Sequence, residues 1–125
     1  MRAADLEMLS TEQLIELFLA ISLAEEDELL YSNDESRGFN KLFREEQAVV
    51  DELQRRPGDQ RSVLLTLYNH QNTWVRHNAA VNSLVLAPEE GRKVLQEIAD
   101  SGELPYSAEA SVTIDALNNG TFVPD

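Results

Sequence analysis

One segment limits the possible folds more than any other: Trp74–Ala87 carries apolar side chains almost all the way round a helix. A helix that is apolar on one side only can lie on the surface of a protein. A helix that is apolar on every side has to be covered by neighbours on more than one flank. We therefore expect Trp74–Ala87 to be an internal helix at the centre of the core.

The rest of the chain shows helical periodicity with clear start and stop signals. Ser10 and Gln13 form a capping-box pattern, after which apolar residues recur at three- and four-residue spacing. Because alternation typical of strands is missing, we predict an all-α fold of about six helices in antiparallel pairs. Besides Trp74–Ala87, the expected helices are the run that begins after Ser10, Asn40–Arg55, Ser62–Tyr68, Glu89–Asp100 and Ser107–Asn119.

The length of 125 residues suits a single domain with one core. Within it, residues 10–56 are expected to form the N-terminal long helices and residues 60–120 the shorter helix pairs. Pro57 and Gly58 separate the two regions, since proline and glycine together end a helix.

The apolar stripe of the first long helix, from Leu14 to Ile21, is followed by carboxylates. If the helix continues, Glu25 and Glu28 fall on the same stripe, and unpaired carboxylates are not buried in a core. We therefore expect the helix to leave the core at about residue 24 or to change its packing face. The run of acids that begins at Glu25, with Asp34 and Glu35 after it, should then be exposed.

Charge and composition exclude several classes of protein. The chain has 23 acidic and 10 basic side chains, a formal charge of −13, and the first 60 residues hold 15 of the acids. Nucleic acids and anionic membranes carry the same sign, so neither is expected as a direct partner. The absence of cysteine excludes a disulfide framework, a zinc ribbon and a thiol nucleophile.

No targeting signal is recognisable in the sequence. The N-terminus has acidic residues where a signal peptide needs a basic stretch followed by an apolar one. The longest apolar-rich run, Leu17–Ala24, is far shorter than the ~20 residues of a membrane-spanning helix. We expect a cytoplasmic protein that does not enter the membrane.

Patterns for catalysis and metal binding are weak. His70 and His77 do not have the spacing of a metal-binding motif, no serine lies in a nucleophile-elbow pattern, and the glycines form no phosphate-binding loop. We expect no enzyme activity, no catalytic residues, no metal and no cofactor. A metal-dependent hydrolase built on the two histidines is the least favoured hypothesis.

Two helix pairs in the second half suggest an α-solenoid, in which each pair of helices covers the next. The segment 72–84 resembles the second helix of a HEAT repeat, whose core is a Val-Arg pair, two small residues and a leucine. The family usually has an aspartate six residues before the arginine. This chain has His70 there, which leaves open whether the arginine links neighbouring repeats. The matching residues are Val75, Arg76, Ala79, Ala80 and Leu84.

The stretch from Asn40 to Gly120 more specifically resembles DUF2019, a family of small bacterial HEAT-like proteins of unknown function. The resemblance implies a short HEAT-like helical domain without established catalysis. Small acidic HEAT-like proteins also resemble some immunity proteins of bacterial polymorphic-toxin systems. The blocks that carry the family resemblance are Leu64–Tyr68, Val75–Ala80, Leu86–Pro88 and Val94–Ala99.

A protein-binding role follows from charge and resemblance together. Leu29, Leu30 and Tyr31 lie among acids, and apolar groups ringed by acids are typical of interfaces. A solvated charged surface explains the acids equally well. Asn78 and Asn82 share one side of the internal helix, where they either bond the backbone or line a partner-binding groove. The candidate partner-binding residues are Glu25, Glu26, Asp27, Glu28, Tyr31, Asp34, Glu35, Trp74, Asn78 and Asn82.

The leading hypothesis is a non-enzymatic immunity protein that neutralises a basic toxin, such as a nuclease effector, by occluding its cationic site. An acidic surface presents the same sign as a nucleic-acid substrate and therefore attracts such a site. The alternative is a HEAT-like scaffold or regulatory protein that binds a housekeeping partner or self-associates. The sequence leaves the oligomeric state open, with a monomer favoured.

Overall fold

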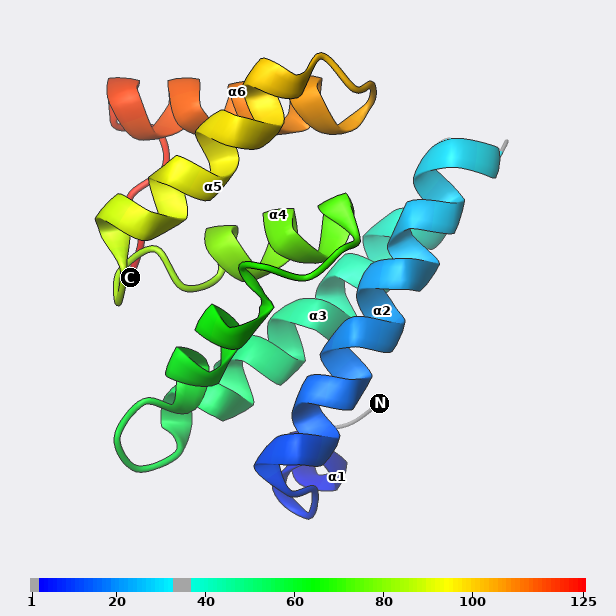
Figure 1. Ribbon diagram of the computed structural model, residues 1–125. Helices are drawn as coiled ribbons and strands as arrows, with labels where there is room; N and C mark the ends of the chain where they lie inside the picture. Colours follow the sequence, from blue (N-terminus) through cyan, green and yellow to red (C-terminus); the bar gives the residue numbers. More distant parts are fainter. Residues whose placement is uncertain (1–2, 33–36) are drawn as a thin grey trace. The chain divides into compact units, whose positions relative to one another are not determined.

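The computed structural model describes residues 3–32 and 37–125 (Figure 1). Over these residues all regular structure is helical, with six α-helices, one 3-10 helix and no strand. The predicted all-α class is confirmed. The chain divides into two compact units, Met1–Val63 and Leu64–Asp125.

The first unit is a hairpin of two long helices preceded by a short one. Helix α1 spans Ala3–Glu7, α2 spans Thr11–Tyr31 and α3 spans Arg37–Arg55. Helices α2 and α3 lie side by side and run antiparallel (Figure 1). The predicted capping box is present: the Ser10 hydroxyl accepts the Gln13 N–H at 3.1 Å, and Gln13 Oε1 accepts the Ser10 N–H at 2.8 Å.

The prediction that the first long helix leaves the core near residue 24 or changes its packing face is wrong. Helix α2 continues without a break to Tyr31, and its apolar stripe passes from Phe18 and Ile21 directly to a fully buried Glu25. A carboxylate is buried only when it has interaction partners, and Glu25 does interact within the protein. Local sequence cannot reveal such partners, which is why the prediction failed.

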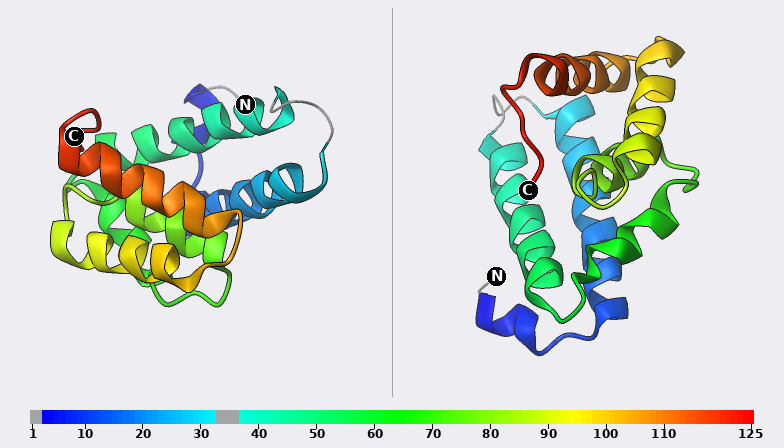
Figure 2. Two further views of the ribbon diagram at one scale, coloured as in Figure 1. Left: turned by 90° about the horizontal axis from the view of Figure 1, so that it is seen from above. Right: turned by 90° about the vertical axis from the view of Figure 1, so that its left-hand side faces the viewer.

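The second unit contains three α-helices. Helix α4 spans Thr73–Val81, α5 spans Pro88–Ser101 and α6 spans Tyr106–Asn119, and α5 and α6 pack closely against each other (Figure 2). A 3-10 helix, η1 (Gln60–Leu67), stands where the sequence predicts a helix over 62–68. Gly102 ends α5 with φ +71°, a left-handed conformation that glycine adopts without strain.

Helix α4 is shorter than predicted, because the helix expected over Trp74–Ala87 ends at Val81. Asn82 Nδ2 donates to the carbonyl of Asn78 at 2.9 Å, and Ser83 Oγ donates to that of Ala79 at 2.6 Å. Such side chains compete with backbone N–H groups for helical carbonyls. The residues from 82 to 86 are a turn, and proline at position 88 disfavours a helical conformation at the residue before it.

The predicted burial of the first part of this segment is confirmed. Trp74, Val75 and Ala79 are all buried. The core of the second unit joins α4, the following turn, α5 and α6 through Ala80, Leu84, Leu95, Ile98 and Ala110. None of the helices in the described ranges combines the length and apolar composition that crossing a membrane requires.

Candidate protein-binding face

One side of α2 is exposed along the whole helix and carries both acidic and apolar side chains. With 3.6 residues per turn, residues at alternating spacings of four and three lie on one side of a helix. Three of the exposed residues are large and apolar: Leu23 is 45 % exposed, Leu30 41 % and Tyr31 77 %. We define the α2 face as Glu12, Glu16, Ala20, Leu23, Asp27, Leu30 and Tyr31.

Two of the predicted partner-binding residues, Asp27 and Tyr31, belong to the α2 face, and Glu26 is half-buried. Asp34 and Glu35 lie outside the described residues. Leu23 was not predicted as a surface residue. It stands seven residues before Leu30, about two helical turns away, and this spacing is the signal that places it on the same side.

Glu25 and Glu28 do not lie on the surface as expected. Glu25 is fully buried on the opposite side of α2, so it is not available to a partner. Glu28 is half-buried, and its carboxyl group lies over the first turn of α3. A Cβ added to Gly38 would be 2.6 Å from the Glu28 carboxyl carbon. Glycine at this position therefore leaves room for the carboxylate beside the positive end of the α3 dipole.

The three predicted residues of α4 and its C-cap are mostly buried as well. Trp74 is only 3 % exposed and stacks on His77 with ring centroids 4.3 Å apart, so it cannot serve as an exposed anchor. Asn78 is buried and Asn82 is half-buried, with its amide donating to the Asn78 carbonyl. Asn82 thus bonds the backbone, as one of the two interpretations has it, whereas Asn78 Oδ1 lies 3.0 Å from His77 Nδ1.

The two histidines take part in local hydrogen bonds. His70 Nδ1 accepts the Asn72 N–H at 3.0 Å, and His77 Nδ1 lies 3.0 Å from Asn78 Oδ1. Burial lowers the pKa of His77, and its bond to Asn78 opposes that shift. Over residues 3–32 and 37–125, no three histidine or carboxylate side chains are grouped so that they could hold a metal ion.

Arg76, whose role the sequence left open, is engaged close to its own position in the chain. Its Nη1 donates to the His70 carbonyl at 2.6 Å and its Nη2 to Thr73 Oγ1 at 3.2 Å. The position where HEAT repeats usually carry an aspartate therefore supplies a backbone carbonyl to the arginine. The guanidinium holds the turn before α4 against the first turn of that helix.

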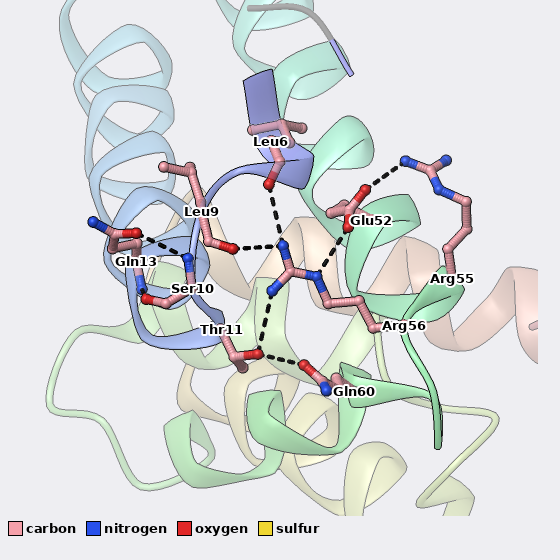
Figure 3. Close-up of polar contacts among 9 residues, drawn as sticks. All are labelled: Leu6, Leu9, Ser10, Thr11, Gln13, Glu52, Arg55, Arg56 and Gln60. Atoms are coloured by element: carbon pink, nitrogen blue, oxygen red, sulfur yellow. Dashed lines mark hydrogen bonds and ion pairs between the residues drawn. The ribbon is translucent and has the colours of Figure 1, made fainter. Parts of the chain in front are cut away.

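A partly buried cluster around Arg56 positions the start of α2 and was not predicted (Figure 3). Arg56, directly after α3, donates from Nη2 to the carbonyls of Leu6 at 3.1 Å and Leu9 at 2.6 Å, and from Nη1 to Thr11 Oγ1 at 3.4 Å. The Thr11 hydroxyl in turn donates to Gln60 Oε1. One guanidinium thus joins the end of α1, the start of α2 and the end of α3.

Glu52 neutralises this guanidinium. It is buried and bonds Arg56 Nε at 2.9 Å and Arg55 Nη2 at 2.8 Å. The hydrogen bond from Arg56, and then that from Arg55, lowers the pKa of the Glu52 carboxyl. A glutamate three and four residues before two arginines is a sequence signal for helical ion pairs, but it does not reveal that Glu52 is buried.

Comparison with known proteins agrees with this architecture. Residues 12–118 match the family described as "Domain of unknown function (DUF2019)". A similar solved structure is the crystal structure of the protein RPA1889 from Rhodopseudomonas palustris CGA009, at 36 % sequence identity and a TM-score of 0.87. The alignment covers 96 % of this chain and 98 % of that one. No curated protein matches significantly. The chain belongs to the DUF2019 family.

Proposed function

We propose that this protein is a non-enzymatic protein-binding module that acts in the cytoplasm and neutralises a basic toxin by covering its cationic site. The observation that supports this function best is the α2 face, on which Leu23, Leu30 and Tyr31 are exposed beside Asp27. Exposed apolar side chains rimmed by charged ones mark protein interaction sites.

The acidic and the apolar side chains of the α2 face have separate tasks. Glu12, Glu16 and Asp27 attract lysines and arginines of the partner and increase the association rate, because complementary charges steer the encounter. Leu30 and Tyr31 become buried in the complex and slow its dissociation, since tyrosine is among the residues that contribute most to binding. A nuclease is a suitable partner because its substrate-binding cleft is positively charged.

The scaffold in this proposal is a short HEAT-like solenoid. Its support is the antiparallel pair of α5 and α6 and the HEAT-like block in α4 with its buried alanines. The same scaffold suits the alternative function, in which the protein binds a housekeeping partner or a second copy of itself. Apolar residues on the α2 face favour either kind of contact, whereas the acids favour a basic partner.

The direct test is binding to the product of the gene adjacent to the one that encodes this chain, with both proteins purified. Replacing Leu30 and Tyr31 together by serine should weaken binding at least about 30-fold, as expected for central interface residues. The control replaces Leu104 and Val112, which are also exposed, by serine and should leave the dissociation constant within about threefold.

Charge reversal separates the two functions. Asp27→Lys should slow association with a basic partner, and the loss should be largest at low salt. The control Asp115→Lys changes the net charge equally on the exposed side of α6. If both reversals act alike, the α2 face does not guide the partner. If the adjacent gene product does not bind but the protein dimerises through Leu30 and Tyr31, the scaffold function is correct instead.

A further inference from the structure

An open groove in the second unit is a second candidate binding site. Its volume is about 600 Å³, within the range of ligand-binding pockets. One wall is a single side of α5, and the other comes from the end of η1 and from the turn after α4. The lining residues are Leu65, Tyr68, Asn69, Leu86, Ala87, Glu90, Lys93, Val94 and Glu97.

The floor of the groove is held in place by hydrogen bonding and tight packing. Tyr68 Oη lies 2.5 Å from Ser83 Oγ. Because the Ser83 hydroxyl already donates to the Ala79 carbonyl, the tyrosine is the donor. Gly91 lets α5 approach closely: a Cβ there would be 2.7 Å from Leu84 Cδ2 and 3.3 Å from Tyr68 Oη. The groove is therefore formed before any ligand arrives.

Three charges border the apolar floor on α5. Glu90, Lys93 and Glu97 are three and four residues apart, so they share one side of the helix, with the Cα atoms of the two glutamates about 10 Å apart along its axis. In the part of the chain that the structure describes, none of the three makes an ion pair. Burial raises the pKa of Tyr68, its hydrogen bond with Ser83 opposes that shift, and the negative charge of Glu90, which lines the same groove, adds to it.

We infer that this groove binds a short segment of a partner protein that carries both aliphatic side chains and lysine or arginine. Leu65, Leu86 and Val94 offer the apolar surface for the aliphatic side chains. The two carboxylates outnumber the single ammonium of Lys93 and accept hydrogen bonds from cationic side chains. The net charge of −13 attracts the same kind of segment over a longer range.

This inference stands apart from the proposed function. All residues of the groove belong to Leu64–Asp125, whereas all residues of the α2 face belong to Met1–Val63. The two sites can therefore be tested one at a time.

The probe for the groove is a fluorescein-labelled decapeptide of alternating leucine and lysine, titrated with the full-length protein and followed by fluorescence anisotropy. Two matched peptides separate the contributions: serine in place of leucine removes the aliphatic groups, and glutamate in place of lysine reverses the charge. We expect the leucine–lysine peptide to bind at least about tenfold more tightly than either. Equal binding of the serine–lysine peptide would overturn the inference.

The protein variants keep the net charge equal. Replacing Glu90 and Glu97 by glutamine should weaken binding of the leucine–lysine peptide about tenfold. The control replaces Glu89 and Glu103, exposed acids outside the groove, by glutamine. Its dissociation constant for the peptide should stay within about twofold of the wild-type value. If both double variants lose the same amount of peptide affinity, the peptide is held by general charge attraction and the groove is not its binding site.

A neutral substitution tests the apolar wall. Leu86→Ser should weaken binding severalfold, and Leu104→Ser, an exposed leucine outside the groove, should not change it. Tyr31→Ala on the α2 face should also leave peptide binding unchanged. If only Tyr31→Ala weakens binding, the peptide binds the α2 face and the inference about the groove is wrong.

Discussion

Arg56 is the residue on which the packing of the first unit depends most. Its guanidinium donates to the carbonyl of Leu6, which also accepts the Leu9 N–H, and to the carbonyl of Leu9, and it balances the charge of Glu52. Helix ends leave carbonyls without intrahelical partners. A charged donor that bonds several such groups at once therefore contributes more to folding stability than an ordinary surface ion pair.

We predict that Arg56→Ala lowers the free energy of unfolding by about 2–3 kcal/mol, because it removes the donor of the buried Glu52 Oε2 and of the Leu9 carbonyl. Arg55→Ala is the matched control. Arg55 also pairs with Glu52, but its side chain is 53 % exposed, and such pairs contribute less than about 1 kcal/mol. Urea unfolding of both variants measures the difference, and equal losses would contradict a special role for Arg56.

His77 makes stability depend on pH. Burial lowers its pKa in the folded state, whereas in the unfolded chain it titrates near about 6.5. Below that pH the unfolded chain binds a proton that the folded chain does not, so stability falls as the pH decreases. The slope is at most about 1.4 kcal/mol per pH unit for one proton.

The test follows the free energy of unfolding from pH 7 to pH 5 in the wild type and two variants. His77→Phe keeps an aromatic ring against Trp74 but cannot titrate, so it should lose most of this decrease. His70→Asn, which retains an acceptor for the Asn72 N–H, should show the same decrease in the free energy of unfolding as the wild type. A decrease that survives in His77→Phe would assign the pH dependence to other groups.

At the scale of the elements, helix starts and stops were predicted well where the responsible residues are local. Ser10 with Gln13 at the start of α2, and Pro57 with Gly58 after α3, act on their own helix ends, so a short stretch of sequence contains the whole signal. The end of α4 was missed. Asn82 and Ser83 can either continue a helix or bond its carbonyls, and in the structure their side chains bond the carbonyls of Asn78 and Ala79.

The capping box yields a prediction for α2. Ser10→Ala removes the acceptor of the Gln13 N–H and should lower the free energy of unfolding by about 1 kcal/mol. Ser111→Ala, at an exposed position inside α6, should change stability by less than about 0.5 kcal/mol. Thermal unfolding of the wild type and both variants measures the loss of stability that each substitution causes. An unchanged stability in Ser10→Ala would show that packing alone holds this helix end.

At the scale of the whole molecule, the charge of −13 affects folding as well as binding. Like charges repel more strongly in the compact state than in the expanded one. We therefore predict that adding sodium chloride from about 0.01 M to 0.15 M stabilises the protein, since the Debye length falls from about 30 Å to 8 Å. The measurement is the unfolding midpoint at each salt concentration. A midpoint that falls with salt would mean that attractive ion pairs outweigh the repulsion.

Local patterns in the sequence were sufficient for the all-α class, the helix caps and the burial of Trp74 and Ala79, because hydrophobic periodicity and capping act within a few residues. The face that each acid occupies was decided by tertiary structure. Glu25 and Asp27 stand two residues apart in one acidic run, yet one is fully buried and the other exposed. Which side of α2 is covered is decided by the helix that packs against it, and only the folded protein brings α2 and α3 together.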